Sequence, residues 1–172
     1  MSVSTDTVAR RNIVRSVTEG AARMANPAPD FSVREATAAD APWIADLALE
    51  LGYHVDVEDV HHRLAALPAT HLVLVAGASD RVVGWLHAFH SQSLLHGDRM
   101  EIAGLAVADD YQGQGVGTML ITHLERWTHR RDIQAIRVLS GSERIAAHQF
   151  YRSRGYRQLK TEHVFTKVPP LG

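Results

Sequence analysis

Cysteine is absent from this chain of 172 residues. Its absence excludes a disulfide framework, a thiolate nucleophile and a cysteine-ligated metal site. Long apolar runs are also missing: none approaches the roughly 20 residues that a membrane-spanning helix needs. Residues 1–16 lack the apolar centre of a secretory signal peptide. These absences predict a cytoplasmic protein that has no membrane partner.

Histidine is frequent, with eleven residues, but the spacing of a helical zinc site, H-E-x-x-H, does not occur. Without this spacing and without cysteine, the histidines do not form a recognisable set of metal ligands. We therefore predict no metal.

The net charge of -1 conceals an uneven distribution of charged residues. Acidic residues dominate residues 30–66, whereas lysine and arginine dominate residues 121–167. Two interpretations remain open: two solvated helical faces, or a site with one acidic and one basic wall. The basic part carries no nucleic-acid-binding motif, so we expect no nucleic-acid partner.

Hydrophobic periodicity predicts the order β-α-α-β-β-β-α-β-α-β-β. The expected strands are residues 31–35, 71–76, 81–90, 100–107, 133–139, 156–160 and 163–167. The expected helices lie between residues 40 and 52, 57 and 67, 116 and 127, and 144 and 154, and residues 91–99 are expected to be a polar loop. A helical crossover joins strands 100–107 and 133–139, which should therefore be parallel. The fold class is α/β (α+β), with a mixed, mostly antiparallel sheet of six to seven strands and helices on both faces.

Residues 1–29 differ from the rest of the chain and end in Asn-Pro-Ala-Pro (residues 26–29). We interpret them as an N-terminal extension, either a short helix or a flexible arm, that precedes a single domain at residues 30–172. If this extension has a function, we expect it to pack on a partner subunit. A homodimer is therefore a possible assembly.

The stretch DYQGQGVGTML, residues 110–120, places three glycines just before an apolar helical pattern. A strand, a glycine-rich turn and a helix start direct free N–H groups at one point, where anions bind. A P-loop would need a lysine after the last glycine, and a dinucleotide fingerprint would need G-x-G-x-x-G; neither is present.

The segment Gln112-Gly-Gln-Gly-Val-Gly117 resembles the Q/R-x-x-G-x-G/A signature of the GNAT superfamily of acetyl-coenzyme A-dependent N-acetyltransferases. The strand of residues 101–107 stands at the spacing found in that family. The segment RIAAHQFYRSRGY, residues 144–156, resembles its late A-x-x-F-Y-x-x-x-G-[FY] motif. The resemblance covers residues 31–168 and implies a GNAT-like domain whose two parallel strands splay apart at the cofactor site.

This resemblance implies that acetyl-coenzyme A is the co-substrate. The backbone amides of the glycine loop would hold its pyrophosphate, and strand backbone would pair with its pantetheine arm. The implied cofactor-binding residues are Leu105, Ala106, Val107, Gln112, Gly113, Gln114, Gly115, Val116, Gly117, Thr118 and His148. Tyr151 is the implied general acid, which protonates the departing thiolate. The spacing of Tyr151 alone is more typical of a core aromatic residue beside Phe150, and the motif match is what favours the acid.

The attacking amine must lose a proton, and several acceptors for that proton remain open. Glu101 matches the position of the glutamate base in one branch of the superfamily. His87 and His90 are alternatives, as is a chain of water molecules.

The acceptor amine is also open. The acidic region before residue 66 favours a small cationic amine such as a polyamine or an aminoglycoside, or a lysine-bearing peptide. An alternative of another class is a GNAT-fold module that binds acyl-coenzyme A without turnover, although the presence of Tyr151 speaks against it.

Overall fold

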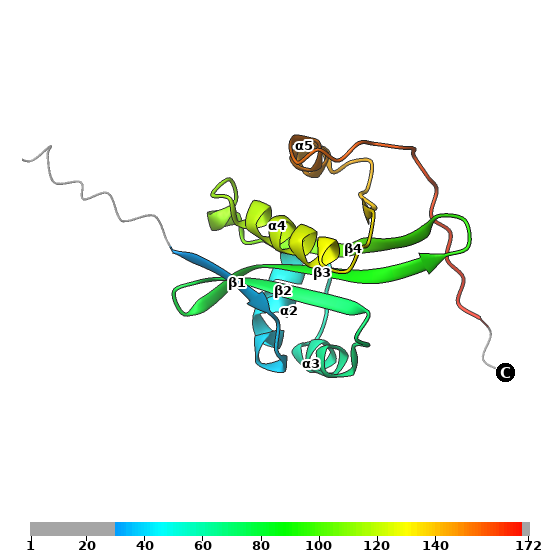
Figure 1. The fold of residues 1–172 in the computed structure, drawn as a ribbon. Helices are drawn as coiled ribbons and strands as arrows, with labels where there is room; N and C mark the ends of the chain where they lie inside the picture. The colour runs from blue at the N-terminus through cyan, green and yellow to red at the C-terminus, as the bar shows by residue number, and fades with distance from the viewer. Residues whose placement is uncertain (1–29, 170–172) are drawn as a thin grey trace, which may run out of the picture. The chain divides into compact units, whose positions relative to one another are not determined.

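A five-stranded sheet, seen in Figure 1, forms the centre of the computed structural model, which describes residues 30–169. The strands are β1 (Phe31–Glu35), β2 (His71–Ala78), β3 (Arg81–Ser93), β4 (Gly97–Val107) and β5 (Ile136–Val138), in that order across the sheet. Strands β1 to β4 are antiparallel neighbours, and β5 is parallel to β4. The prediction of a mixed, mostly antiparallel sheet is confirmed. The predicted extension, residues 1–29, lies outside the described residues.

Helices cover both faces of the sheet (Figure 1). They are α2 (Ala41–Glu50), α3 (Val57–Ala66), α4 (Val116–His129) and α5 (Ile145–Ser153), with short 3-10 turns η1 (Ala38–Asp40) and η2 (Asp109–Tyr111). The apolar stripe of α4, which includes Leu120 and Leu124, packs with Leu86 of β3 in one core. On the other face, Ile44 of α2 packs with Val75 of β2 in a second core. Within residues 30–169, no helix is long and apolar enough to cross a lipid bilayer.

The region predicted as a polar loop, residues 91–99, is mostly sheet. Strand β3 continues to Ser93 and β4 begins at Gly97, so that only a tight turn separates them. Gly97 has a φ of 65°, the left-handed conformation that such a turn requires. Polar side chains do not prevent pairing, because the backbone groups form the hydrogen bonds of a strand ladder.

The two final strands predicted at residues 156–160 and 163–167 are not formed within the described chain. The predicted strand at residues 133–139 is reduced to Ile136–Val138, and the sheet has five strands rather than six to seven. A sequence of alternating polar and apolar residues forms a strand only where another strand is available to pair with it. In the single chain, Leu159, Val164 and Phe165 remain exposed instead.

An ion pair with a buried carboxylate joins β1 to the start of α2. Asp40 is only 4% exposed, and its two carboxylate oxygens each accept a hydrogen bond of 2.7 Å from the guanidinium of Arg34. The backbone N–H and the hydroxyl of Thr37 donate to the same carboxylate at 2.7 and 3.0 Å. The Arg34 guanidinium is the main reason why the pKa of Asp40 falls to about 2. The charged carboxylate therefore stabilises the folded chain.

We predict that Asp40→Asn lowers the free energy of unfolding at pH 7 by roughly 1–3 kcal/mol, because it removes the charged acceptor of four hydrogen bonds. The pKa of Asp40 is lower in the folded than in the unfolded chain, so its contribution is present above about pH 4 and is lost towards pH 2. Urea unfolding followed by circular dichroism at several pH values measures this. A difference between the two proteins that stays constant down to pH 2 would contradict it.

Candidate active site

The site begins where β4 and β5 part. These parallel strands pair only at Met100–Ile136, Glu101–Arg137 and Ile102–Val138. At the same point the register between β3 and β4 shifts: Ala88 pairs with Ile102 and His87 with Gly104, so Ala103 has no partner on β3. Beyond this bulge, β4 continues to Val107 without β5 beside it. The predicted splayed pair is confirmed, and it leaves one edge of β4 open to a ligand.

A cleft of about 600 Å³ occupies the space between the splayed strands. Its walls come from the open part of β4, the glycine loop, the segment after β5, α5 and the C-terminal end of α2. Of the residues predicted for the site, these line it: Leu105, Ala106, Val107, Gln112, Gly113, Gly115, Val116, Gly117, Thr118 and Tyr151. The structure therefore brings most of the predicted residues to one cavity.

The glycine loop forms the start of helix α4. Gly113 and Gly115 have φ of 72° and 90°, and Gly115 is the N-cap of α4. The first helical hydrogen bond runs from the N–H of Met119 to the carbonyl of Gly115, at 3.0 Å. The N–H groups of Val116, Gly117 and Thr118 consequently have no acceptor within the helix, and the helix dipole adds positive potential beside them. This loop can hold a phosphate group.

The third glycine of the loop, Gly117, has a different role. A Cβ atom at Gly117 would lie 3.3 Å from the ring of Phe150, whereas one at Gly113 or Gly115 would meet no atom within 4 Å. Gly117 therefore allows α4 and α5 to approach closely. Gly113 and Gly115 instead allow the backbone to adopt the left-handed conformation of the loop. Gln112 holds the loop to β4, since its side-chain amide donates to the carbonyl of Val107 at 3.1 Å.

Tyr151 extends from α5 into the cleft and packs edge-to-face against Phe150 and Tyr156, with ring centroids 5.3 and 5.4 Å apart. Burial raises the pKa of Tyr151 to about 12, against the opposing effect of Arg144. The phenol therefore keeps its proton at neutral pH, and it can donate that proton to a group in the cleft.

Arg144 was not predicted as a site residue, although it lines the cleft. Its guanidinium donates to the carbonyl of Leu51 at 3.1 Å, and this bond ties the start of α5 to the end of α2. Glu50, Tyr53 and Asp109 also line the cleft without having been singled out. Burial and the neighbouring Asp109 raise the pKa of Glu50. The acidic composition of residues 30–66 was the signal for Glu50, whereas Asp109 and Arg144 lie outside that region.

Three predicted residues do not line the cleft. Gln114 donates from its side chain to the carbonyl of Asp110 at 2.7 Å. His148 is half-buried on α5, with Nε2 2.9 Å from the carbonyl of Gly141. Glu101 is 9% exposed and forms ion pairs with Arg99 and with Arg137, the latter at 3.7 Å.

The two alternative bases, His87 and His90, also lie away from the cleft lining. The Nε2 atom of His87 is 2.9 Å from Nδ1 of His71, so one ring donates to the other. Burial, followed by the effect of His71, lowers the pKa of His87. His90 lies 3.5 Å from Asp98. None of the three predicted protein bases has a contact that connects it to Tyr151.

The cleft places a glycine-rich helix start beside an open strand edge, which is the arrangement expected from the resemblance to acetyltransferases. The model of the acetyltransferase (GNAT) family matches residues 38–156, which is more than half of the chain. The chain belongs to this family and is an N-acetyltransferase that transfers an acetyl group to an amine.

Relatives support this assignment. The chain is 29% identical over 146 residues to an aminoglycoside N(6')-acetyltransferase type 1 of Stenotrophomonas maltophilia, covering 81% of this chain and 94% of that protein. Among solved structures, AAC(6')-Iy in complex with the bisubstrate analogue CoA-S-monomethyl-acetylneamine superposes with a TM-score of 0.70 at 16% identity, covering 81% and 99% of the two chains. The soil-metagenome aminoglycoside acetyltransferase meta-AAC0020 with sisomicin gives a TM-score of 0.67 at 20% identity, covering 81% and 97%. The last two likenesses show the fold.

We predict that Gly115→Ala and Gly97→Ala lower the free energy of unfolding by similar amounts, roughly 1 kcal/mol, because both positions have positive φ and open space around them. Only Gly115→Ala should raise the KM for the acetyl donor, by several-fold, because only Gly115 sets the direction of the N–H groups at the start of α4. Thermal unfolding and steady-state kinetics measure the two effects. Equal changes of KM in the two variants would refute a special role for Gly115.

Proposed function

We propose that this enzyme transfers the acetyl group of acetyl-coenzyme A to a primary amine of a small, polycationic acceptor by direct attack, with Tyr151 as general acid. The observation that carries the proposal is the single cleft that contains the glycine loop, the open edge of β4 and the hydroxyl-bearing ring of Tyr151. The relatives' complexes with coenzyme A derivatives support the choice of donor.

The residues of the cleft fit the chemistry of coenzyme A. Its pyrophosphate needs N–H donors and positive potential, which the start of α4 supplies together with the hydroxyl of Thr118. Its pantetheine arm carries amide groups, which match the open edge of β4 at Leu105, Ala106 and Val107. A backbone N–H on this edge would stabilise the negative charge that develops on the thioester oxygen during attack.

The proposed reaction balances as follows. The neutral amine nitrogen bonds to the thioester carbon, the carbon–sulfur bond then breaks, and the phenol of Tyr151 gives its proton to the departing sulfur. The nitrogen loses one proton to water, and water returns a proton to the Tyr151 phenolate, which restores the acid. We assign this proton to water because Glu101, His87 and His90 are all held in contacts outside the cleft.

The acidic residues of the cleft support a cationic acceptor. Glu50 at the end of α2 and Asp109 after β4 lie close enough for their charges to interact, and both line the cleft. Adjacent carboxylates attract a molecule with several ammonium groups. The relative from Stenotrophomonas maltophilia is an aminoglycoside acetyltransferase, and an aminoglycoside is the acceptor class that we propose here.

Tyr151→Phe should lower kcat about 100-fold, because the general acid is lost while the ring packing against Phe150 and Tyr156 is retained. Tyr156→Phe is the matched control: its hydroxyl is buried without a hydrogen-bond partner, so its removal should leave kcat within about two-fold and stability unchanged or higher. Stopped assays of free thiol release give both values. Equal kcat values for Tyr151→Phe and the unaltered enzyme would exclude the proposed acid.

A panel of amines tests the acceptor. With acetyl-coenzyme A, aminoglycosides and polyamines should support thiol release, and acidic amino acids should not. Glu50→Gln should raise the KM for the cationic acceptor about ten-fold with kcat nearly unchanged. Glu58→Gln is the control, since Glu58 is an exposed residue of α3 outside the cleft. Binding of acetyl-coenzyme A without turnover on any amine would instead identify a non-catalytic binding module.

A further inference from the structure

The exposed side of α3 brings two histidines and one carboxylate together. Glu58, His61 and His62 stand at positions i, i+3 and i+4 of the helix, which are neighbours on its surface. Their potential ligand atoms, two imidazole nitrogens and one carboxylate oxygen, all lie within 4.8 Å of one another. All eleven histidines of the chain fall within residues 30–169, and in that part of the chain no other three metal-ligating side chains converge in this way.

The distances between these atoms fit a single metal ion. Two ligands that are each about 2.1 Å from a tetrahedral ion lie roughly 3.4 Å apart. Nε2 of His62 and Oε1 of Glu58 are already 3.0 Å apart. The ring of His61 has its centroid 6.0 Å from that of His62, and its side chain is exposed. Rotation of the His61 side chain can therefore complete the set without a movement of the backbone.

The helix that carries these side chains is fixed from beneath. Val60 of α3 is only 7% exposed and packs with Ile44 of α2 in the second core. The N–H of Val60 also donates to the carbonyl of Asp56 at 3.0 Å, at the start of the helix. An ion that binds to side chains on an already ordered helix does not have to order the backbone.

The charges around the cluster favour a cation. Asp56, Glu58 and Asp59 lie in or beside the first turn of α3, and the one arginine of the helix is Arg63. The guanidinium of Arg63 donates to Asp59 at 3.1 Å, so that its contact is with Asp59 and not with Glu58. The remaining negative charge attracts a divalent cation to the side chains of the cluster.

The ligand types select the kind of metal. Imidazole nitrogen together with one carboxylate oxygen suits Zn²⁺ and its neighbours Cu²⁺ and Ni²⁺, whereas Mg²⁺ and Ca²⁺ take oxygen ligands. Three protein ligands leave a coordination position for water, which reaches this exposed surface. The absence of H-E-x-x-H led to the prediction of no metal, but Glu58-x-x-His61-His62 also places two imidazoles on one helix surface.

We propose that Glu58, His61 and His62 form a site on α3 for one Zn²⁺ ion or a similar transition-metal ion. The bound ion links the first and second turns of α3 and stabilises the folded chain by mass action. None of the three residues lines the cleft, so the ion has a structural role and does not enter the acetyl transfer.

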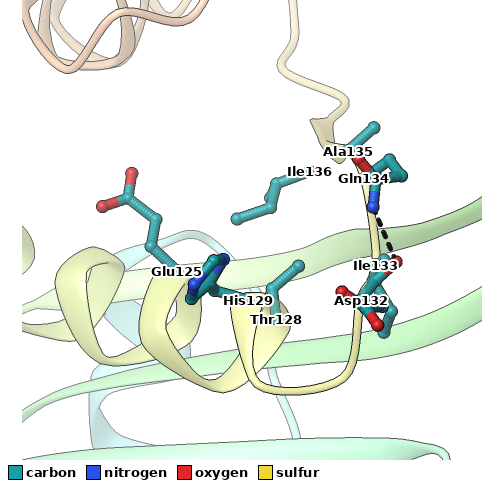
Figure 2. Close-up of a pocket in the computed structure, with 8 residues that line it drawn as sticks. All are labelled: Glu125, Thr128, His129, Asp132, Ile133, Gln134, Ala135 and Ile136. Atoms are coloured by element: carbon teal, nitrogen blue, oxygen red, sulfur yellow. Dashed lines mark hydrogen bonds between the residues drawn. The ribbon is translucent and has the colours of Figure 1, made fainter.

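A second glutamate–histidine pair, on α4, provides the matched control. Glu125 and His129 have the same i, i+4 spacing as Glu58 and His62, and Figure 2 shows both side chains projecting from α4. They line a groove of about 360 Å³ together with Asp132, but these three do not form a convergent group of ligands. His129→Ala removes an exposed helical histidine that has no place in the proposed site.

Calorimetric titration of the full-length chain with Zn²⁺, without an affinity tag, tests the site. The unaltered chain should bind one ion and gain thermal stability, and Mg²⁺ should give no comparable heat. His61→Ala should raise the dissociation constant at least about ten-fold and abolish most of the gain, because a direct ligand is lost. His129→Ala should change neither value. No saturable binding up to about 1 mM Zn²⁺, or equal effects of the two substitutions, would overturn the proposal.

Nuclear magnetic resonance locates the ion independently of the variants. Cu²⁺ is paramagnetic and prefers the same imidazole ligands. At a substoichiometric amount, it should broaden the amide signals of residues 57–66 before those of any other helix. Broadening that starts around His129 or His96 would place the ion elsewhere and refute the site on α3.

Discussion

The separation of β4 from β5 after Ile102 is the constraint on which the site depends. If β5 had continued alongside β4, its backbone would have occupied the edge that now faces the cleft. The bulge at Ala103 contributes to this separation, because an extra residue bends a strand and increases its local twist. The bulge leaves the pairing of β3 with the later part of β4 intact, from Gly104 to Val107. The open edge of β4 is therefore held rigidly on one side while the other side is free.

The two cores place the remaining parts of the site around that edge. Leu120 and Leu124 bury α4 against the sheet, which places the glycine loop at the end of β4. On the opposite face, Ile44 buries α2, whose C-terminal end carries Glu50. The hydrogen bond from Arg144 to the carbonyl of Leu51 joins α5 to the end of α2. Tyr151 and Glu50 consequently belong to one cavity, although they lie on different helices and a hundred residues of chain separate them.

Short-range patterns in the sequence predicted most of the residues that the fold brings together on the β4 and α4 side of the cleft. The glycine spacing, the apolar stripe of α4 and the segment around Tyr151 are all local, and the structure brings them to one cleft. Contacts between distant residues were not predictable in the same way. The bond between Arg144 and Leu51 spans 93 residues, and the pairing of Glu101 with Arg137 depends on the short parallel ladder. The expected strands after Tyr156 had the right alternation, but alternation does not specify the edge that receives a strand.

Local composition and position in the fold also differ for the acidic region, residues 30–66. Most of the acids in residues 30–66 are on the solvent-facing side of the fold: Glu58 and Asp59, for example, form exposed pairs with His62 and Arg63 along α3. Of the acids in that region, only Glu50 lines the cleft, and its neighbour Asp109 comes from a different part of the sequence. The acidic composition of residues 30–66 therefore contributes one carboxylate to the cleft, that of Glu50, and the fold places it beside Asp109. In the function that we propose, discrimination among acceptors depends on this pair and on its distance from the open edge of β4, which long-range packing sets.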